Sequence, residues 1–458
     1  MDKRQRLVLA IAILASFVAF LDGSVVNVAL PAISRDLGGG LTTQQWVVDA
    51  YLITLGSLIL VAGSLSDVYG RVAVLRWGLI GFGATSVLCA IAPTSEFLII
   101  SRGVQGVAGA LLVPSSLALI MSNFRGTAQA KAIGAWTGWT SASFIAGPIL
   151  GGLFVDAISW RLIFAINVLP IAATLWLLFR LKQSDERDRS VHIDYISAAL
   201  AVVGVGAPVF ALIEQGHFGW ASPAIYLPMA LGIVAFAAFL RRQAKVEQPM
   251  MPLELFRVRN FGMGNIATTF IYGALSLVFF LLAVFLQQVG GYPATVAAIA
   301  ILPVMILLMV LSSRFGALSG RYGPRLFMTA GPILMAAACL LMLTVSADVN
   351  YWTQLLPGIV VFGLGLAVTV APLTSAILGS ISEKQSGIGS AINNAVSRVA
   401  GLITIAMLGV ISGAQLDLPG FERGLIVCSV LLALGGLVSA AGIRNPVPEP
   451  AATVAEAR

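Results

Sequence analysis

Long apolar stretches alternate along the chain with short polar segments that are rich in glycine, proline and arginine. A helix that crosses a bilayer needs about 20 mostly apolar residues, and the chain offers fourteen stretches of this kind. Six lie before residue 182 and begin near Leu7, Gln44, Val72, Phe97, Ala132 and Arg161. Two form a hairpin, Tyr195 to Ile213 and Ile225 to Leu240, and six more begin near Phe261, Ala294, Arg325, Thr353, Ser386 and Phe421. The pattern predicts an all-α polytopic membrane protein with fourteen transmembrane helices.

The composition agrees with a chain whose solvent is largely lipid. Hydrophobic residues make up 58% of the chain and charged residues 10%, with a mean hydropathy of +0.95. Soluble proteins carry about 25% charged residues, so this chain cannot cover its surface with groups that suit water. The three cysteines, Cys89, Cys339 and Cys428, lie inside apolar stretches, which indicates packing roles and no disulfide framework.

The basic residues are distributed unequally between the two ends of the predicted helices. If the N-terminus is cytoplasmic, the outer ends hold only Arg35, Arg161 and Arg423, and the other loop Lys and Arg residues lie inside. Cytoplasmic loops of membrane proteins carry the excess of Lys and Arg. We therefore predict that both termini face the cytoplasm, and the net charge of +7 requires no nucleic acid to explain it.

A short segment occurs twice in the chain. Gly63-Ser-Leu-Ser-Asp67-Val-Tyr-Gly70-Arg71 returns in weaker form as Gly316-Ala-Leu-Ser-Gly320-Arg-Tyr-Gly323-Pro-Arg325, 253 positions later. Each copy lies between the second and third helices of its group of six, and two parallel six-helix repeats are a known transporter architecture. The prediction is an N-terminal six-helix bundle (1–181), two extra transmembrane helices with linkers (182–260), a C-terminal six-helix bundle (261–442) and a cytoplasmic tail (443–458).

Further motifs, taken together in their order, resemble the major facilitator superfamily and, within it, the fourteen-helix drug–proton antiporters. The superfamily's loop signature is matched by Gly63, Leu65, Asp67, Gly70 and Arg71, while Val68 and Val72 replace two basic residues. The other matching segments are Leu21-Asp22 to Pro31, Trp46-Val-Val-Asp49-Ala-Tyr51, Arg102-Gly-Val-Gln105-Gly106, Gly147-Pro148-Ile-Leu-Gly151-Gly152, Trp160 to Pro170 and Pro252-Leu-Glu-Leu-Phe256. Ser143 stands where the fifth-helix motif usually has glycine.

The resemblance implies a proton-coupled antiporter that exports small lipophilic, often cationic, drugs or toxic compounds across the bacterial cytoplasmic (inner) membrane by alternating access. We expect a monomer that is not an enzyme and binds no cofactor or metal. Its expected partners are the transported compound, protons and the lipid bilayer. No Gly-x-x-x-x-Gly-Lys-Ser/Thr segment occurs, which disfavours transport driven by ATP. A dedicated exporter of one metabolite or natural product, a proton-coupled importer and, more distantly, a non-transporting receptor stay open as alternatives.

Four charged residues lie well inside predicted spans: Asp22, Asp49, Arg102 and Arg398. A charge at the centre of a bilayer costs about 2.5–3.5 kcal/mol on insertion scales, so each needs a partner or a function. A rise of about 1.5 Å per residue places Asp22, Asp49 and Arg102 at one depth, and we predict a cluster in which Arg102 pairs with one or both aspartates. Burial favours the protonated acid and a nearby arginine favours the carboxylate, so these three are the predicted proton-coupling residues.

The competing interpretation is structural: the aspartates tie helices together through Arg102. Arg398 has no acidic partner in its half of the sequence, and it is interpreted either as a ligand of backbone carbonyls or as a site for an anionic substrate group.

The predicted substrate cavity draws charged, aromatic and amide side chains from both halves: Asp22, Asp49, Tyr51, Gln105, Trp136, Tyr272, Asn393 and Arg398. The predicted gating residues are two charges after the second helix and a run in the fifth helix: Asp67, Arg71, Gly147, Pro148 and Gly151. Proline bends a helix and glycine permits close helix contact, although an ordinary kinked packing helix is the competing interpretation of that run.

Overall fold

The computed structural model describes residues 1–181, 193–346, 348–382, 385–413 and 416–445. Over these residues the chain is helical, and no strand is found among them. Fourteen helices are long and apolar enough to cross a membrane, which confirms the predicted number of spans and the fold class. The predicted tail lies outside the described residues beyond position 445, as does the linker 182–192. The boundaries proposed between the bundles stay a prediction.

The first bundle contains six spans, the last of them broken. Its helices are α1 (Lys3–Leu37), α2 (Gly40–Tyr69), α3 (Arg71–Ala90), α4 (Ser95–Asn123), α5 (Gly126–Ala157), α6 (Leu162–Ala165) and α7 (Val168–Leu181). The helices begin earlier than the apolar pattern indicates because polar residues extend their ends. Asp2, for example, caps α1 by accepting a hydrogen bond from the Gln5 amide at 2.6 Å.

The extra hairpin consists of α8 (Tyr195–Phe218) and α9 (Pro223–Gln243), followed by the short helix η1 (Leu253–Arg257). Small residues let its helices approach closely, since a methyl group on Gly204 would lie 2.9 Å from the Phe236 backbone nitrogen. Helix α8 also packs against α2 and against α14 (Ser386–Ala406). One side of the hairpin therefore touches both bundles.

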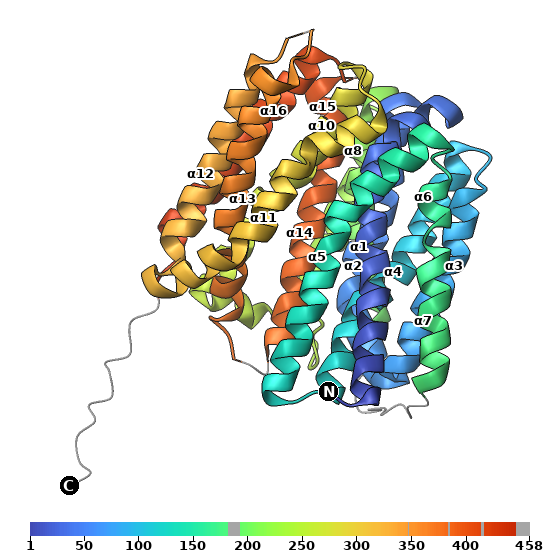
Figure 1. The fold of residues 1–458 in the computed structure, drawn as a ribbon, viewed down its shortest axis with the longest axis vertical. Helices are drawn as coiled ribbons and strands as arrows, with labels where there is room; N and C mark the ends of the chain where they lie inside the picture. Colours follow the sequence, from blue (N-terminus) through green and yellow to red (C-terminus); the bar gives the residue numbers. More distant parts are fainter. Residues whose placement is uncertain (182–192, 347, 383–384, 414–415, 446–458) are drawn as a thin grey trace.

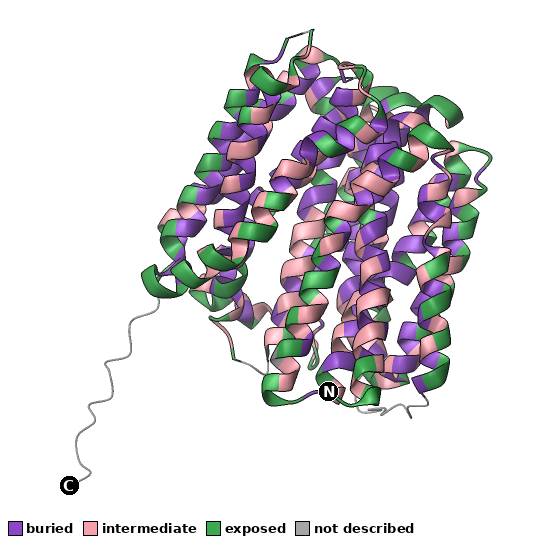
Figure 2. Cartoon of the chain, viewed as in Figure 1, coloured by how far each residue is buried: buried purple, intermediate pink, exposed green. Residues whose placement is uncertain are grey.

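The second bundle repeats the six-span arrangement. Its remaining elements are α10 (Arg259–Gln288), α11 (Ala294–Tyr322), α12 (Pro324–Leu341), η2 (Met342–Thr344), η3 (Tyr351–Leu355), α13 (Leu356–Leu378), α15 (Leu408–Ser412) and α16 (Leu418–Gly442). Figure 2 shows that the outward faces of the helices are largely exposed. Large apolar side chains such as Phe179, Ile100 and Leu231 lie on these faces, where lipid is the solvent that suits them.

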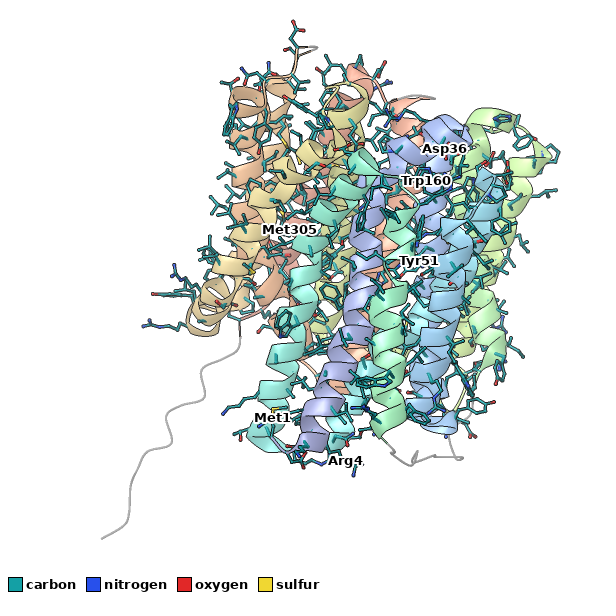
Figure 3. The ribbon with its side chains drawn as sticks, turned by 45° about the vertical axis from the view of Figure 1, so that its right-hand side comes forward. Met1, Arg4, Asp36, Tyr51, Trp160 and Met305 are labelled. Atoms are coloured by element: carbon teal, nitrogen blue, oxygen red, sulfur yellow. The ribbon has the colours of Figure 1, made fainter. Side chains whose placement is uncertain are left out.

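Helix α1 begins and α16 ends at one end of the molecule, which we call the N-side; the opposite end is the far side (Figure 1). Met1 and Arg4 mark the N-side in Figure 3, Asp36 and Trp160 mark the far side, and Tyr51 lies between them.

The two bundles are closed together at the far side. There α5 packs against α11, and a methyl group on Gly152 would lie 2.5 Å from the Thr295 Cα atom. Toward the N-side α5 and α11 diverge (Figure 1), and after Val304 the only fully buried residue of α11 is Ser319. On another side of the molecule α2 contacts α14. The described state is therefore closed at the far side and separated along α5 and α11 toward the N-side.

Candidate functional site

A buried ion pair lies inside the first bundle. The Arg102 Nη1 atom on α4 donates to Asp22 Oδ2 on α1 at 2.6 Å, and Arg102 is 1% exposed and Asp22 0%. Arg102 Nε donates to the Val47 carbonyl on α2 at 3.1 Å, and the guanidinium lies 4.2 Å from the Tyr51 ring centroid. The pair thus joins α1, α2 and α4 at one depth, as the sequence spacing indicates.

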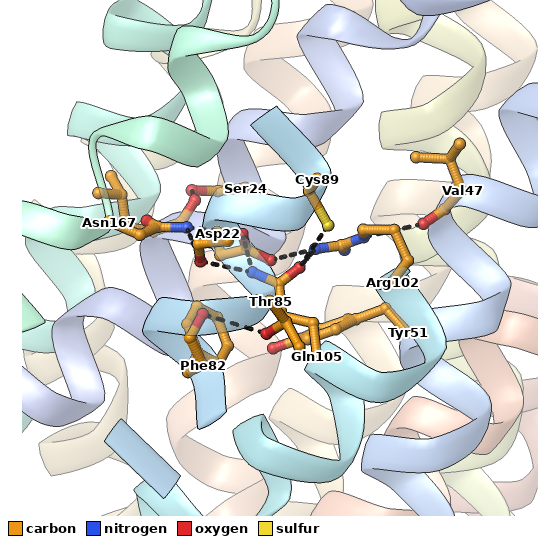
Figure 4. Close-up of polar contacts among 12 residues, drawn as sticks. Asp22, Ser24, Val47, Tyr51, Phe82, Thr85, Cys89, Arg102, Gln105 and Asn167 are labelled. Atoms are coloured by element: carbon orange, nitrogen blue, oxygen red, sulfur yellow. Dashed lines mark hydrogen bonds and ion pairs between the residues drawn. The ribbon is translucent and has the colours of Figure 1, made fainter. Parts of the chain in front are cut away.

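Amide side chains complete the bonding of this pair (Figure 4). Gln105 accepts from Arg102 at 2.7 Å and donates to Asp22 Oδ1 at 3.2 Å and to Ser86 Oγ at 2.9 Å. Asn167 donates to the same Asp22 oxygen at 2.9 Å and to Ser86 at 3.3 Å. We call Asp22, Ser86, Arg102, Gln105 and Asn167 the bonded cluster. Because both Asp22 oxygens accept hydrogen bonds, the cluster is a connected network that holds the helices of the first bundle together.

Two members of the bonded cluster were not among the predicted site residues. Asn167 lies in the break between α6 and α7, and Ser86 lies on α3. Asn167 belongs to the Trp160 to Pro170 motif, and a polar amide beside a helix break inside an apolar span was the available signal. Ser86 offered no such signal, since serine is common in transmembrane helices and packs between them in many roles.

Asp49 is buried but belongs to no network. It is 0% exposed, and neither of its carboxyl oxygens has a hydrogen-bond partner within the described part of the chain. Arg102 pairs with Asp22 and not with Asp49, although it binds the carbonyl of Val47 nearby. An ionised carboxylate without donors is strongly unfavourable in a low-dielectric surrounding, whereas the protonated acid is neutral. The geometry of this state therefore suits a protonated Asp49.

Asp49 faces the contact between the two bundles. Gln45, one turn earlier, donates to the carbonyls of Ile405 (2.7 Å) and Ala406 (3.1 Å) at the end of α14. Gly56, two turns later, lies against Arg398 of α14, since an added methyl group would be 3.5 Å from the Arg398 Cβ atom. The spacing of four and seven residues puts Gln45, Asp49 and Gly56 on one helix face. Asp49 consequently lies on the face of α2 that meets α14.

Two more polar groups near this contact have no partner. The Tyr51 hydroxyl is buried and unbonded, and the Arg398 Nε atom is buried and unbonded, among the residues the structure describes. Tyr51 and Arg398 are close enough to interact electrostatically. We call Asp49, Tyr51 and Arg398 the unbonded group.

The other predicted cavity residues bond within their own bundles. Asn393 on α14 donates to Asn265 (3.1 Å) and Thr268 (2.9 Å) on α10, and Trp136 on α5 donates to Ser16 on α1 at 3.0 Å. Tyr272 on α10 is half-buried among apolar side chains. Their part in binding a substrate stays a prediction, as does that of the remaining cavity residues.

The predicted gating residues fall into separate places. Asp67 and Arg71 lie 3.9 Å apart at the N-side ends of α2 and α3, with both side chains partly exposed. Gly147 and Gly151 face α1, where added methyl groups would collide with Ser24 and Val25. These two glycines therefore serve packing inside the first bundle in this state, while Gly152 meets the second bundle; the gating role of the run with Pro148 stays a prediction.

Asp156, also absent from the predicted site, links the two bundles at the far side. Its carboxylate accepts hydrogen bonds from the backbone amides of Ala294 (3.0 Å) and Thr295 (2.8 Å), the first residues of α11. A carboxylate there also meets the positive end of the α11 dipole. Nearby, Gln287 of α10 donates to the Val28 carbonyl of α1 at 2.9 Å. Backbone partners 138 and 139 positions away leave no mark in a sequence pattern.

In the described ranges, no three His, Cys, Asp or Glu side chains gather in a way that could hold a metal ion. The expectation that the protein works without a metal or cofactor stays a prediction.

Comparisons with known proteins agree with this architecture. The sequence profile of the family described as Major Facilitator Superfamily matches residues 12–405 and also 315–458. The multidrug resistance protein Stp of Mycobacterium tuberculosis (strain CDC 1551 / Oshkosh) is 35% identical over 434 residues, which cover 92% of this chain and 79% of that protein. The methylenomycin A resistance protein of Bacillus subtilis (strain 168) is 32% identical over 406 residues, covering 88% and 87%. A crystal structure of the peptide transporter POT in complex with sulfate shares the fold, with a TM-score of 0.72, 14% identity and coverage of 96% and 98%.

Proposed function

This chain belongs to the Major Facilitator Superfamily, and on that basis we propose that it exports small lipophilic, often cationic, drugs or toxic compounds in exchange for protons. The names of its relatives, a multidrug resistance protein and an antibiotic resistance protein, support export of such compounds. The chain contributes the spans, and an ion gradient contributes the energy.

The observation that carries the proton-coupled part is Asp49. It is a fully buried acid without a hydrogen-bond donor, and it lies at a contact between the bundles. Movement of one bundle against the other changes what surrounds it, and only a proton makes the present surroundings acceptable. Asp49 therefore takes up a proton in one state and gives it up in another. Asp22, by contrast, is held by Arg102, Gln105 and Asn167, which supports a role in holding the bundle.

Alternating access follows from the closure at the far side. The contacts of Gly152 and Asp156 with α11 hold the far side shut, while α5 and α11 separate toward the N-side. The opposite state needs these contacts to open and the N-side to close. In this scheme the N-side, which carries the excess of Lys and Arg, is cytoplasmic, and the protein lies in the bacterial inner membrane with both termini inside.

Proteoliposomes with an enclosed pH-sensitive dye and an imposed proton gradient test this proposal. The added compounds are the cation rhodamine 6G, the neutral dye Nile red and the anion fluorescein. We expect several of these compounds to trigger proton movement in the wild type, and we expect Asp49→Asn to insert normally and lose that movement. Asp348→Asn, the same chemical change at an exposed loop acid, is the matched control. Full proton-coupled flux in Asp49→Asn would overturn the assignment.

A dedicated exporter of a single compound is the second candidate, and the name of the methylenomycin A relative is the observation that favours it. Such an exporter would respond to none of the three dyes and to one physiological compound. The breadth of the response in the same liposomes therefore separates the two candidates.

A further inference from the structure

Arg398 is a membrane-embedded arginine without an acceptor. It lies on α14, it is half-buried, and no described residue accepts a hydrogen bond from its guanidinium. An unpaired charge in a span is expensive, and its presence calls for a function. Ser390, Asn394 and Ser397 are half-buried on the same helix, and Asn394 and Ser397 bond to carbonyls of α14 itself. This side of α14 is therefore partly open, which lets Arg398 keep its charge.

Arg398 and Asp49 are the two members of an ion pair that is not formed. Of the four charged residues deep in the spans, Asp22 and Arg102 cancel each other, which leaves one acid and one base. Both meet the α2–α14 contact, and Arg398 meets α2 at Gly56, seven residues from Asp49. Seven residues correspond to about 10 Å along a helix, or about two turns. A slide of α14 along α2, combined with extension of the long arginine side chain, closes this distance; helix shifts of one turn occur at bistable interfaces.

No other charge around Asp49 is free to take this part. On the elements packed against α2, Arg102 of α4 is bound to Asp22 of α1 and to the Val47 carbonyl. Glu214 of α8 accepts from Trp46 at 2.7 Å, and Cys89 of α3 donates to Gln105. Tyr51 lies on α2 itself and is uncharged at neutral pH.

We propose that Arg398 is the counter-charge of proton-free Asp49: the pair forms when Asp49 has released its proton and separates when a proton binds. This inference rests on the proposed proton antiport. An antiporter must change state both with and without its proton, and a bare carboxylate could not stay buried in the proton-free state. The guanidinium supplies the donors that Asp49 lacks. A cationic substrate close to Asp49 would supply positive charge instead, so the dependence on Arg398 is greatest for neutral substrates.

Proton release from the purified protein in weakly buffered detergent tests the proposal. With Nile red, a neutral probe, we expect the wild type and Arg398→Lys to release protons and Arg398→Gln to release at least about tenfold less at neutral pH, since a tenfold change corresponds to the loss of one charge-assisted contact. With rhodamine 6G, a cation, we expect release from all three proteins. Arg314→Gln, at an exposed arginine of α11, is the matched control and should behave as the wild type.

Equal Nile red release by Arg398→Gln and the wild type would overturn the inference while leaving the proposed function intact. Loss of release with both dyes in Arg398→Gln would also overturn it, because a role in substrate binding or folding would explain that result. If the wild type releases no proton with any dye, the proposed function itself fails. Removal of an unpaired buried charge does not destabilise the fold, so Arg398→Gln should melt at or above the wild-type temperature.

Discussion

Arg102 and Arg398 are two arginines in transmembrane helices with opposite surroundings. Arg102 donates to a carboxylate, an amide oxygen and a carbonyl, and it lies against Tyr51. Arg398 meets the same helix α2 from the other bundle, and no described residue accepts from it. A bonded buried charge resists movement because each partner would lose its bonds. An unbonded one is already at its least favourable and can only gain by movement. The difference separates side chains that hold the fold from side chains that drive transport.

The strongest test of this difference is stability. Arg102→Gln leaves Asp22 buried without its counter-charge, and we expect a loss of about 3–5 kcal/mol of unfolding free energy. Arg398→Gln removes a charge that has no partner, so its melting temperature in detergent should equal or exceed that of the wild type. Adding Asp22→Asn to Arg102→Gln should recover part of the loss, because no unpaired charge is then left. Equal melting temperatures of the two single arginine variants would break the comparison.

A second prediction concerns the closure between bundles. Gly152→Ala places a methyl group 2.5 Å from the Thr295 Cα atom, and backbone cannot move aside as a flexible side chain can. Overpacking of this kind costs about 1–3 kcal/mol, so the far side should open more often. Labelling of a cysteine introduced at Val155 by a membrane-impermeant maleimide measures this opening.

Gly138→Ala on the same helix is the control for that experiment, since an added methyl group meets nothing within 4 Å there. Unchanged labelling in Gly152→Ala would show that the α5–α11 contact does not close the far side.

Asp156 should have a smaller effect in the same assay. Asp156→Ala removes the acceptor for two amides of α11, and loss of a helix cap costs about 0.5–2 kcal/mol. We expect a modest rise in the labelling rate at position 155. Asp417→Ala removes a cap inside the second bundle, where Asp417 accepts from Gly420 at 2.8 Å, and should leave the labelling rate unchanged. An equal rise in both variants would point to general loosening of the structure.

The smallest predicted effect lies outside the spans, at the N-side end of the hairpin. Burial alone would raise the pKa of Asp194, but hydrogen bonds from Arg242 and Ser197 outweigh it and hold the pKa below its ordinary value. The carboxylate therefore stabilises the hairpin above its unfolded pKa, and this stability is lost as the pH falls through the folded pKa. Because Arg242 is partly exposed, we expect well under about 1 kcal/mol. Hydrogen exchange of α8 and α9 should quicken at acid pH in the wild type, and the Asp194→Asn variant should show little of this change.

The sequence predicts the fold well because the signal is physical and long-range order is not needed. Each span is long and apolar, and membrane helices satisfy their own backbone hydrogen bonds, so the number of spans follows from hydropathy. The pairing of Arg102 with Asp22 was also predictable from their common depth. Which aspartate would be paired was not, because the choice depends on the rotation of α1, α2 and α4 about their axes.

The missed residues share one property: their partners are remote or are backbone atoms. Asp156 bonds to amides at the start of α11, and Gly152 meets the backbone of Thr295, so neither leaves a pattern of matched side chains. Asn167 depends on a helix break that hydropathy does not mark. The unpaired state of Asp49 and Arg398 could not be predicted either, since it is a property of one packing arrangement of the two bundles.

Infrared difference spectroscopy of the purified protein at neutral pH, before and after addition of Nile red, tests the central claim most directly. The account predicts a band of a protonated carboxyl group in the substrate-free wild type that disappears when substrate is added. The band should be missing in Asp49→Asn and present in the control Asp348→Asn. A wild type without this band, or an Asp49→Asn variant that keeps it, would contradict the claim that the unbonded acid between the bundles carries the proton.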